Sequence, residues 1–342
     1  MAGDSRPTMV DVARTAGVSL KTVSRVVNGE TTVAPDLAAR VRAAVESLNY
    51  RPHLGASMLR RNDRRTRTIG VLLEDVGNPF SALVHRGIED EARLRGVQVL
   101  IGSLDEDPQR ERELAGAFAQ RDADGMIIAP TGADQSYLRS LPDTPVVFVD
   151  RPGTGHAADS VLATNVSGSR DAARHLVARG HRRIAYLGDQ AGIATARDRH
   201  RGFVAALGAA GLTPFAERRL RHSSYAETAT LALFARPDRP TALFTGQNLI
   251  TIGAFRALRR LGLHRRVALV GFDDFPLADL LDPAVTVIAQ DPMTMGRMAA
   301  RALLERIGGL SRDLSAAARD QGRRDPDLAG WHVQAGDAVE EQ

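Results

Sequence analysis

From residue 69 onward, short apolar runs alternate with segments of helical periodicity, and this rhythm constrains the fold more than any other feature of the chain. The apolar runs are Ile69–Leu73, Val97–Ile101, Gly125–Ala129, Val146–Val149, Ile184–Leu187, Ala242–Phe244 and Val267–Val270. Helical patterns lie between them at Phe80–Arg95, Gln109–Arg121, Ser167–Arg179, Arg197–Ala210 and Leu249–Leu261. Strands that alternate with helices form parallel, doubly wound sheets, and two such series predict an α/β core of two similar lobes.

Composition excludes several classes of protein. The 342 residues contain no cysteine, so neither a disulfide framework nor a cysteine metal site can form. No apolar run reaches membrane-spanning length, and no apolar segment follows a basic start at the N-terminus as in a secretory signal. We therefore expect a cytoplasmic protein that makes no contact with a membrane.

Charge is unevenly divided along the chain. Residues 1–68 carry 12 Lys and Arg against 6 Asp and Glu, whereas residues 69–342 carry 33 against 35. A basic head on a near-neutral body indicates a polyanionic partner, usually nucleic acid, although a solvated basic arm has the same charge.

The basic head has the pattern of three short helices. Thr8 with Asp11 predicts a capped first helix, Gly17 ends it, Ser19 caps a second, and Pro35 begins a third. The apolar positions are Val10, Val12, Ala13 and Ala16 in the first helix, Val23, Val26 and Val27 in the second, and Leu37, Val41, Val45 and Leu48 in the third. Two short helices joined by a Gly-containing turn and braced by a third predict an all-α helix-turn-helix.

Three segments of this head carry a family resemblance. Val10–Ser19 (VDVARTAGVS), Thr22–Asn28 (TVSRVVN) and Leu48–Pro52 (LNYRP) resemble the signature of the lac-repressor/galactose-repressor (LacI/GalR) family, and the similarity continues to about residue 307. The resemblance implies a DNA-binding transcription regulator, a repressor with a periplasmic-binding-protein-like core that holds a small-molecule effector. One departure is Ala34, where the family has a capping serine; Pro35 favours a helix start there.

The second helix of a helix-turn-helix enters the major groove, and its early residues reach base edges. A single motif reads only half a site, so we expect a homodimer on a near-palindromic double-stranded DNA operator. By resemblance, a short hinge helix follows and inserts Leu59 into the minor groove; a flexible linker is the alternative. The expected DNA-binding residues are Thr8, Ser19, Leu20, Lys21, Thr22, Ser24, Arg25, Asn28, Tyr50, His53, Ala56, Leu59 and Arg60.

These patterns divide the chain into four segments. They are a helix-turn-helix headpiece (1–52), a hinge helix and linker (53–67), a two-lobed effector-binding and dimerisation core (68–310) and a tail (311–342). The first lobe is expected at 68–165 and 291–310, and the second at 166–290. The tail departs from the family, because it has neither a strand pattern nor the apolar heptads of a coiled coil. We expect it to be mostly disordered, with an altered reading frame that replaced the final strand as the alternative.

Ligands of doubly wound folds bind outside the carboxyl ends of the strands. Arg199, in an Arg-x-x-Gly-Phe motif, and Asp273 match family positions that bind the effector, and an arginine fork suits hydroxyl or carboxylate oxygens. The chain has Gln247-Asn248 where many relatives have Asn-Asp, which removes a negative charge. The expected effector-binding residues are Asp75, Asn78, Phe80, Thr131, Asp150, Arg199, Gln247, Asp273 and Gln290, with a sugar or sugar derivative as ligand.

Three other classes of protein fit the sequence less well. An enzyme would need a phosphate-binding loop, a dinucleotide fingerprint or a metal-ligand spacing, and none is present, so no catalytic residue, cofactor or metal is expected. A sugar-transport binding protein predicts a signal peptide and no helix-turn-helix. A nucleoid protein that binds DNA without an effector would not need a two-lobed core.

Overall fold

The computed structural model describes residues 7–27, 30, 32–50, 65–132, 134–308 and 331–334. The chain divides into two compact units, Met1–Thr66 and Arg67–Gln342, each with its own hydrophobic core. We describe each unit by itself.

The smaller unit contains the three predicted helices. They are α1 (Met9–Ala16), α2 (Leu20–Val27) and α3 (Pro35–Ser47). Thr8 and Asp11 form a capping box at α1: each side chain accepts from the other residue's backbone N–H, and the bonds from Thr8 lower the pKa of the Asp11 carboxyl. Gly17 ends the helix in the left-handed conformation (φ 63°), which glycine adopts without strain.

The core of this unit forms where the three helices meet. Val12, Val23 and Val41, one from each helix, are fully buried there. Val10 departs from the predicted apolar stripe, since 54% of it is exposed. Helical periodicity explains this: Val10 lies two residues before Val12, about 200° around the axis, and so faces solvent.

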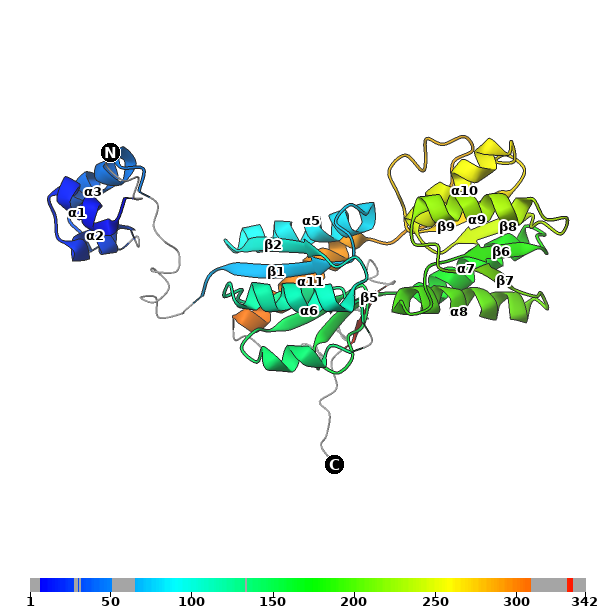
Figure 1. Ribbon diagram of the computed structural model, residues 1–342, viewed down its shortest axis with the longest axis horizontal. Helices are drawn as coiled ribbons and strands as arrows, with labels where there is room; N and C mark the ends of the chain where they lie inside the picture. The colour runs from blue at the N-terminus through cyan, green and yellow to red at the C-terminus, as the bar shows by residue number, and fades with distance from the viewer. Residues whose placement is uncertain are drawn as a thin grey trace, which may run out of the picture. The chain divides into compact units, whose positions relative to one another are not determined.

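The larger unit contains two separate sheets, each flanked by its own helices (Figure 1). The first has the order β11-β5-β4-β3-β1-β2 and the second β10-β9-β8-β6-β7. The first consists of β1 (Thr68–Leu73), β2 (Gln98–Ser103), β3 (Met126–Ile128), β4 (Val146–Val149), β5 (Asp159–Ala163) and β11 (Trp331–Gln334). The second consists of β6 (Ile184–Leu187), β7 (Phe215–Glu217), β8 (Ala242–Thr245), β9 (Ala268–Phe272) and β10 (Thr286–Ile288). Apart from the β11–β5 pair, the strands are parallel, as predicted.

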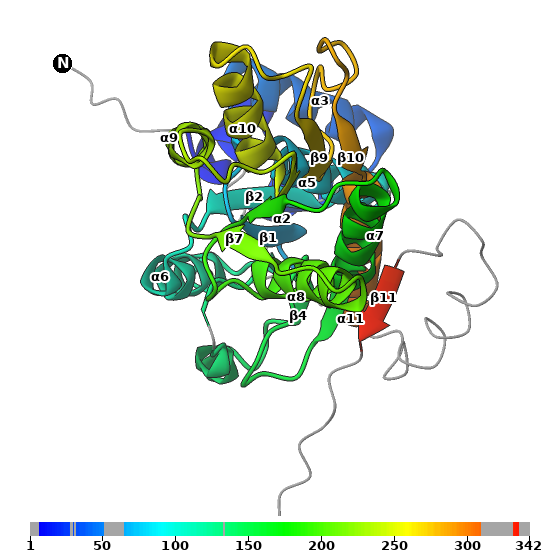
Figure 2. The ribbon, with the colours of Figure 1, turned by 90° about the vertical axis from the view of Figure 1, so that its right-hand side faces the viewer.

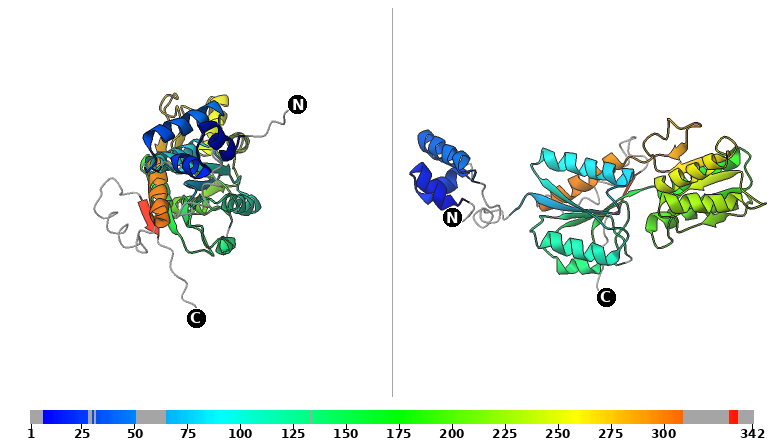
Figure 3. Two further views of the ribbon diagram at one scale, coloured as in Figure 1. Left: turned by 90° about the vertical axis from the view of Figure 1, so that its left-hand side faces the viewer. Right: turned by 45° about the horizontal axis from the view of Figure 1, so that its top comes forward.

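The helices cover both faces of each sheet. We call the first sheet with its helices the first lobe; its helices are α5 (Pro79–Leu94), α6 (Pro108–Ala119), the 3-10 helix η1 (Ser136–Ser140) and α11 (Pro292–Ile307). The second lobe holds α7 (Asn165–Ala178), α8 (Ala194–Ala209), α9 (Ser223–Phe234) and α10 (Asn248–Arg260). The right-hand view of Figure 3 shows α5 and α6 on opposite sides of the first sheet. The chain passes from the first lobe to the second after β5, and returns after β10.

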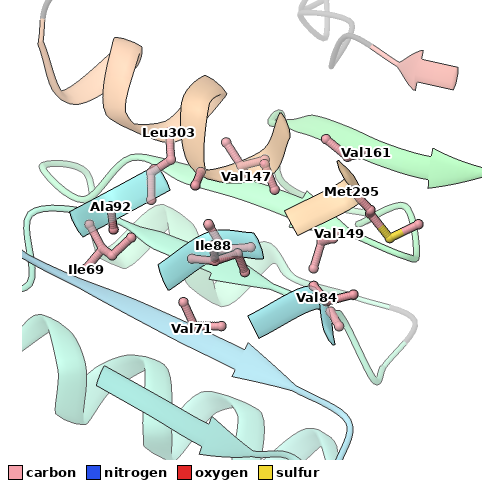
Figure 4. Close-up of a cluster of buried hydrophobic side chains, with 14 of the residues drawn as sticks. Ile69, Val71, Val84, Ile88, Ala92, Val147, Val149, Val161, Met295 and Leu303 are labelled. Atoms are coloured by element: carbon pink, nitrogen blue, oxygen red, sulfur yellow. The ribbon is translucent and has the colours of Figure 1, made fainter. Parts of the chain in front are cut away.

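Strand alternation builds a core on each side of each sheet. In the first lobe, Ile69 and Val71 point to α5 and α11, where they pack against Ile88 and Leu303 (Figure 4), whereas Leu72 packs on the α6 side. In the second lobe, α7 and α8 cover one face and α9 and α10 cover the other. Both faces of these strands are therefore buried, which explains the continuous apolar runs of the sequence.

The C-terminal part of the chain corrects one expectation. Residues 331–334 form strand β11, which pairs antiparallel with β5 at the edge of the first sheet (red in Figure 2). We expected no strand between residues 311 and 342, and this is wrong for these four residues. An edge strand is held by backbone hydrogen bonds to its neighbour, so a four-residue strand needs no long alternating pattern. The rest of the predicted tail lies outside the described residues.

Two glycines allow α5 and α11 to approach closely. A Cβ on Gly87 would overlap the carbonyl oxygen of Met293, and a Cβ on Gly296 would overlap that of Val84. We expect Gly87→Ala to lower the free energy of unfolding of the larger unit by about 1–3 kcal/mol, because backbone cannot move aside as a flexible side chain can. Urea unfolding followed by circular dichroism measures the loss.

A matched control is Gly116→Ala in α6, where the new Cβ would meet nothing within 4 Å. This substitution should raise stability by about 0.5–1 kcal/mol, because alanine loses less backbone entropy in a helix. Equal effects of the two substitutions would contradict the close approach of α5 and α11.

Candidate functional site

The outer face of α2 presents the residues that were predicted to read DNA. Lys21 and Arg25 are exposed, and Leu20 is 43% exposed. The hydroxyl of Ser19 accepts from the backbone N–H of Thr22 at 3.1 Å, which caps the helix as predicted. Since the apolar side of α2 is buried against α1 and α3, this polar side is the one that a partner can reach.

The remaining predicted DNA-binding residues have different surroundings. Thr8 is exposed and caps α1, Ser24 is half-buried on α2, and Tyr50 is buried in the core of the smaller unit. The others, together with most of the predicted hinge, lie outside the described residues: they are Asn28, His53, Ala56, Leu59 and Arg60.

Arg25 has an acidic neighbour in the same unit. Its Nε lies 3.4 Å from Oε2 of Glu30, and both side chains are nearly half exposed. A DNA phosphate or base would have to compete with this carboxylate for the guanidinium, and would also be repelled by it. We therefore expect Glu30, which sequence reasoning did not single out, to oppose DNA binding.

We expect Glu30→Gln to strengthen DNA binding several-fold at low salt. The glutamine keeps the size of the side chain but removes the charge that competes for Arg25, so the gain should shrink as salt rises. Fluorescence anisotropy with a labelled duplex at three salt concentrations measures it. Glu46→Gln, an exposed carboxylate on α3, is the control; an equal gain there would show that only net charge matters.

A narrow cleft in the larger unit is lined mostly by polar residues, which come from both lobes. From the first lobe come Glu74, Asn78, Phe80, Asp150 and Arg151, and from the second come Asp189, Ile193, Thr195, Ala196, Arg199, Gly246, Gln247 and Asp273. Glu74, Asp150, Gly246 and Asp273 directly follow β1, β4, β8 and β9. The cleft thus lies where the sequence predicted it, at the carboxyl ends of parallel strands.

Asp150 and Asp273 occupy equivalent positions in the two lobes. Each follows a strand, has a positive φ (65° and 66°), and donates its backbone N–H to a carbonyl of the neighbouring strand, Val161 at 2.9 Å and Ile288 at 3.0 Å. A positive φ is uncommon outside glycine and tends to occur at functional sites, where surrounding structure enforces it. The same local geometry therefore directs one carboxylate from each lobe to the cleft.

Arg199 is the most heavily bonded side chain in the cleft and is only 6% exposed. Its Nε donates to Oδ1 of Asn165 at 2.7 Å, and its Nη1 donates to the carbonyl oxygen of Gly246 at 2.8 Å and to Oδ2 of Asp273 at 3.0 Å. The guanidinium carbon lies 4.0 Å from the centre of the Phe272 ring, a cation–π contact. These contacts fix the arginine rigidly in one orientation.

Asp273 is bonded through both carboxylate oxygens. Oδ2 accepts from Arg199, and Oδ1 accepts from Nε2 of Gln290. Burial raises the pKa of Asp273, and the Arg199 guanidinium partly opposes this shift. The structure therefore brings together three of the predicted residues, Arg199, Asp273 and Gln290.

Two interactions connect the lobes directly across the cleft. Nδ2 of Asn248 donates to Oδ1 of Asn78 at 2.9 Å, and both residues are buried. Arg221 lies 3.7 Å from Glu74. Gln247, which was also predicted, instead donates to Oδ2 of Asp189 within the second lobe at 2.8 Å.

Three predicted residues do not line the cleft, and one of them, Gln290, bonds Asp273 from outside the lining. Asp75 accepts from the backbone N–H of Gly77 and shapes the turn after β1. Thr131 donates its backbone N–H and its hydroxyl to Oε2 of Glu111, a buried carboxylate on α6. Sequence reasoning missed Glu74 and Asp189, which do line it; Asp189 closely follows β6, so its place after a strand was the available signal.

Glu74 has a strongly shifted pKa. Burial and the nearby Glu106 carboxylate raise it to about 7, although Arg151 and Arg221 act in the opposite direction. In the unfolded chain the group titrates near 4.5, so between these pH values the folded state binds the extra proton. A raised carboxyl pKa means that stability is lost as pH rises through this window.

Between pH 4.5 and 8, we therefore expect the free energy of unfolding of the wild-type larger unit to fall by up to roughly 3 kcal/mol relative to that of Glu74→Gln. The size follows because each pKa unit corresponds to about 1.4 kcal/mol. Urea unfolding of the two proteins across this range measures the difference. The exposed Glu113→Gln should leave the pH profile of the wild type unchanged. Parallel profiles for wild type and Glu74→Gln would show that Glu74 does not titrate in this window.

The described residues contain no group of three or more His, Asp or Glu side chains placed to hold a metal ion. Among the described helices, none is long and apolar enough to cross a membrane.

Comparisons with known proteins agree with this arrangement. Residues 8–53 match the family described as bacterial regulatory proteins, lacI family, and residues 173–321 match a periplasmic binding protein-like domain. The ribose operon repressor of Escherichia coli (strain K12) is 32% identical over 315 residues, which cover 88% of this chain and 93% of the relative. The chain belongs to the LacI family. It is thus a DNA-binding transcription regulator of that family, and not an enzyme, as the sequence resemblance implied.

Solved structures support the fold assignment. The lac repressor dimer bound to operator and the anti-inducer ONPF is 26% identical, with a TM-score of 0.78, and the match covers 90% of this chain and 94% of that one. A complex of the transcriptional regulator CelR with cellobiose is 29% identical, with a TM-score of 0.63, covering 89% and 94% of the two chains.

Proposed function

We propose that this LacI-family protein is a cytoplasmic repressor that binds a near-palindromic operator as a homodimer and is controlled by a neutral, polyhydroxylated effector, a sugar or sugar derivative. The observation that carries the proposal is the cleft, where buried arginines and buried or half-buried carboxylates from both lobes converge. The exposed polar face of α2 supplies the DNA-reading surface.

The charge of the cleft favours a neutral ligand over an anion. Its lining contains four carboxylates, Glu74, Asp150, Asp189 and Asp273, against two arginines. Even with Glu74 half protonated near pH 7, the carboxylates outnumber the two arginines. Carboxylates accept hydrogen bonds from hydroxyl groups, whereas an anionic ligand would be repelled by the excess negative charge. The half-buried Phe80 offers an apolar surface for the carbon-bound face of a sugar ring.

Individual atoms remain available for such a ligand. Oδ1 of Asp150 is buried and has no hydrogen-bond partner among the described residues, so a ligand hydroxyl would satisfy it. We propose Asp150 and Arg199 as the main ligand contacts, with Asp273 holding Arg199 in place. Relatives named for the ribose operon and for a complex with cellobiose agree with a sugar ligand.

The cleft must widen or rearrange to admit the effector. Its volume is about 50 Å³, whereas ligand pockets usually measure about 300–1,000 Å³. Ligand binding would therefore compete with the contacts that join the lobes, Asn78 with Asn248 and Glu74 with Arg221. An effector that prefers one lobe arrangement shifts the population toward it, and this shift is the proposed signal to the DNA-binding unit.

A thermal-shift screen against neutral sugars, polyols, sugar phosphates and purines tests the proposal. A ligand at 100 times its Kd stabilises the folded protein by about 2.7 kcal/mol, which is readily measured. We expect a neutral sugar to raise the Tm of the wild type, to change operator affinity, and to have much less effect on Asp150→Asn. The effector proposal fails if only anionic compounds stabilise the protein, or if Asp150→Asn responds like the wild type.

A further inference from the structure

A second, larger groove lies at the opposite end of the second lobe. Its volume is about 480 Å³, and it is formed by the end of α7, the second half of α10, the start of β9 and the loop before β10. The ligand cleft lies at the other ends of the same elements, where Asn165 begins α7 and Asp273 follows β9. The two sites are therefore separate.

The lining of this groove is strongly basic. Its polar members include three histidines and three arginines, and the described residues that line it include no Asp or Glu. They are His175, Arg179, His181, His264, Arg265 and Arg266. Arg265 forms an ion pair with Asp282, just outside the groove. Arg179 and Arg266 form no ion pair within the described part of the chain.

Helix ends account for only part of this charge. His175 and Arg179 lie at the C-terminal end of α7, where cations stabilise any helix. His181 comes instead from the segment before β6, and His264 and Arg266 come from the segment between α10 and β9. Basic side chains from three separate segments thus converge on one space.

Two further features distinguish the groove from a merely solvated basic surface. Part of its wall is apolar, with the partly exposed Val267, Leu269 and Val285 among the lining residues. Nδ1 of His264 is buried without a hydrogen-bond partner among the described residues, and its ring meets the Phe255 ring edge-on at 6.4 Å between centroids. Basic and apolar side chains thus share one wall of the groove, which suits a ligand with an anionic group and an apolar body.

We propose that this groove binds a small organic anion, a phosphate ester or carboxylate with an apolar body. The arginine forks match the oxygens of either anion, and the partly exposed side chains of Val267, Leu269 and Val285 would cover the apolar body. The volume falls within the range of about 300–1,000 Å³ that ligand sites occupy. The charge preference is opposite to that of the cleft, so the groove takes a different class of ligand.

Isothermal titration of the full chain with phenyl phosphate, benzoate and inorganic phosphate tests this proposal. We expect phenyl phosphate or benzoate to bind at least tenfold more tightly than inorganic phosphate, because only they fill the apolar wall; the tighter of the two identifies the anion. Arg266→Gln and Arg179→Gln, both exposed, should each weaken binding about tenfold. Arg259→Gln, on α10 but outside the groove, should not.

Three outcomes would overturn the proposal. The first is that the wild type binds none of the three probes at millimolar concentration. The second is that phenol, the neutral analogue, binds as tightly as phenyl phosphate. The third is that Asp150→Asn in the cleft alters binding of the anion while Arg266→Gln does not, which would place the anion in the other site.

Discussion

Arg199→Ala is expected to lower the free energy of unfolding of the larger unit by about 3–5 kcal/mol and to abolish the response to the effector. The substitution leaves the buried carboxylate of Asp273 without its cation, and Oδ1 of Asn165 and the carbonyl oxygen of Gly246 without their donor. An uncompensated buried charge is far more costly than a lost surface ion pair. Urea unfolding measures the stability, and operator binding with and without effector measures the response.

A double-mutant cycle measures the interaction free energy between Arg199 and Asp273 apart from their other contacts. Asp273→Asn should partly rescue the stability of Arg199→Met, because the neutral amide needs no cation. The double variant should therefore lose less free energy of unfolding than the sum of the losses of the two single variants. Arg201→Ala is the matched control on the same helix, since its ion pair with Asp198 is exposed and should contribute little. Strictly additive losses for Arg199 and Asp273 would contradict a coupled buried pair.

Lys21→Ala is expected to weaken binding to the preferred operator by about 5–100-fold and to relax the base preference at one or two positions. Lys21 is exposed in the first turn of α2, where a recognition helix contacts base edges, and one good contact to a base discriminates by about 1–3 kcal/mol. Selection of bound duplexes from a randomised library, followed by anisotropy titration, measures both effects.

Arg42→Ala provides the comparison for Lys21. Arg42 is exposed on α3, outside the recognition helix, so its removal should leave the base preference unchanged. If the Arg42 guanidinium contacts a DNA phosphate, the affinity of Arg42→Ala should fall equally for all DNA sequences. The slope of log affinity against log salt concentration should then decrease in magnitude by about one unit. If Lys21→Ala showed this uniform behaviour and kept the selected sequence, Lys21 would be a phosphate contact and our interpretation of α2 would be wrong.

Periodicity alone was sufficient to predict most of the fold. Short continuous apolar runs between helices identified β1, β4, β6 and β8, because strands buried on both faces are mostly apolar along their length. The strands that were not predicted are short or begin with polar residues: β7 has three residues, and β5 begins with Asp159-Ser160. Helix α9 was also missed, since its small and apolar residues surround the whole helix and leave no clear polar face.

The cleft was predictable in location but not in its pairings. Position after a strand, together with the family resemblance, pointed to Asp150, Arg199 and Asp273. It could not decide between the adjacent acids Glu74 and Asp75, because successive residues point in opposite directions and only the folded turn shows which one faces the cleft. The pairing of Arg199 with Asp273 joins residues 74 positions apart, so no local pattern contains it.

Operator binding in the presence and absence of the effector tests the central claim most directly. An operator duplex is selected from a randomised library, and its Kd for the full chain is measured by anisotropy at fixed salt, with the sugar that the thermal screen identifies added or omitted. We predict a Kd for the selected duplex at least 10³-fold lower than for a scrambled duplex, and a sugar-dependent change of about 5–150-fold in that Kd that Asp150→Asn abolishes. Equal affinity for both duplexes, or an operator affinity that no cleft ligand changes, would contradict the account.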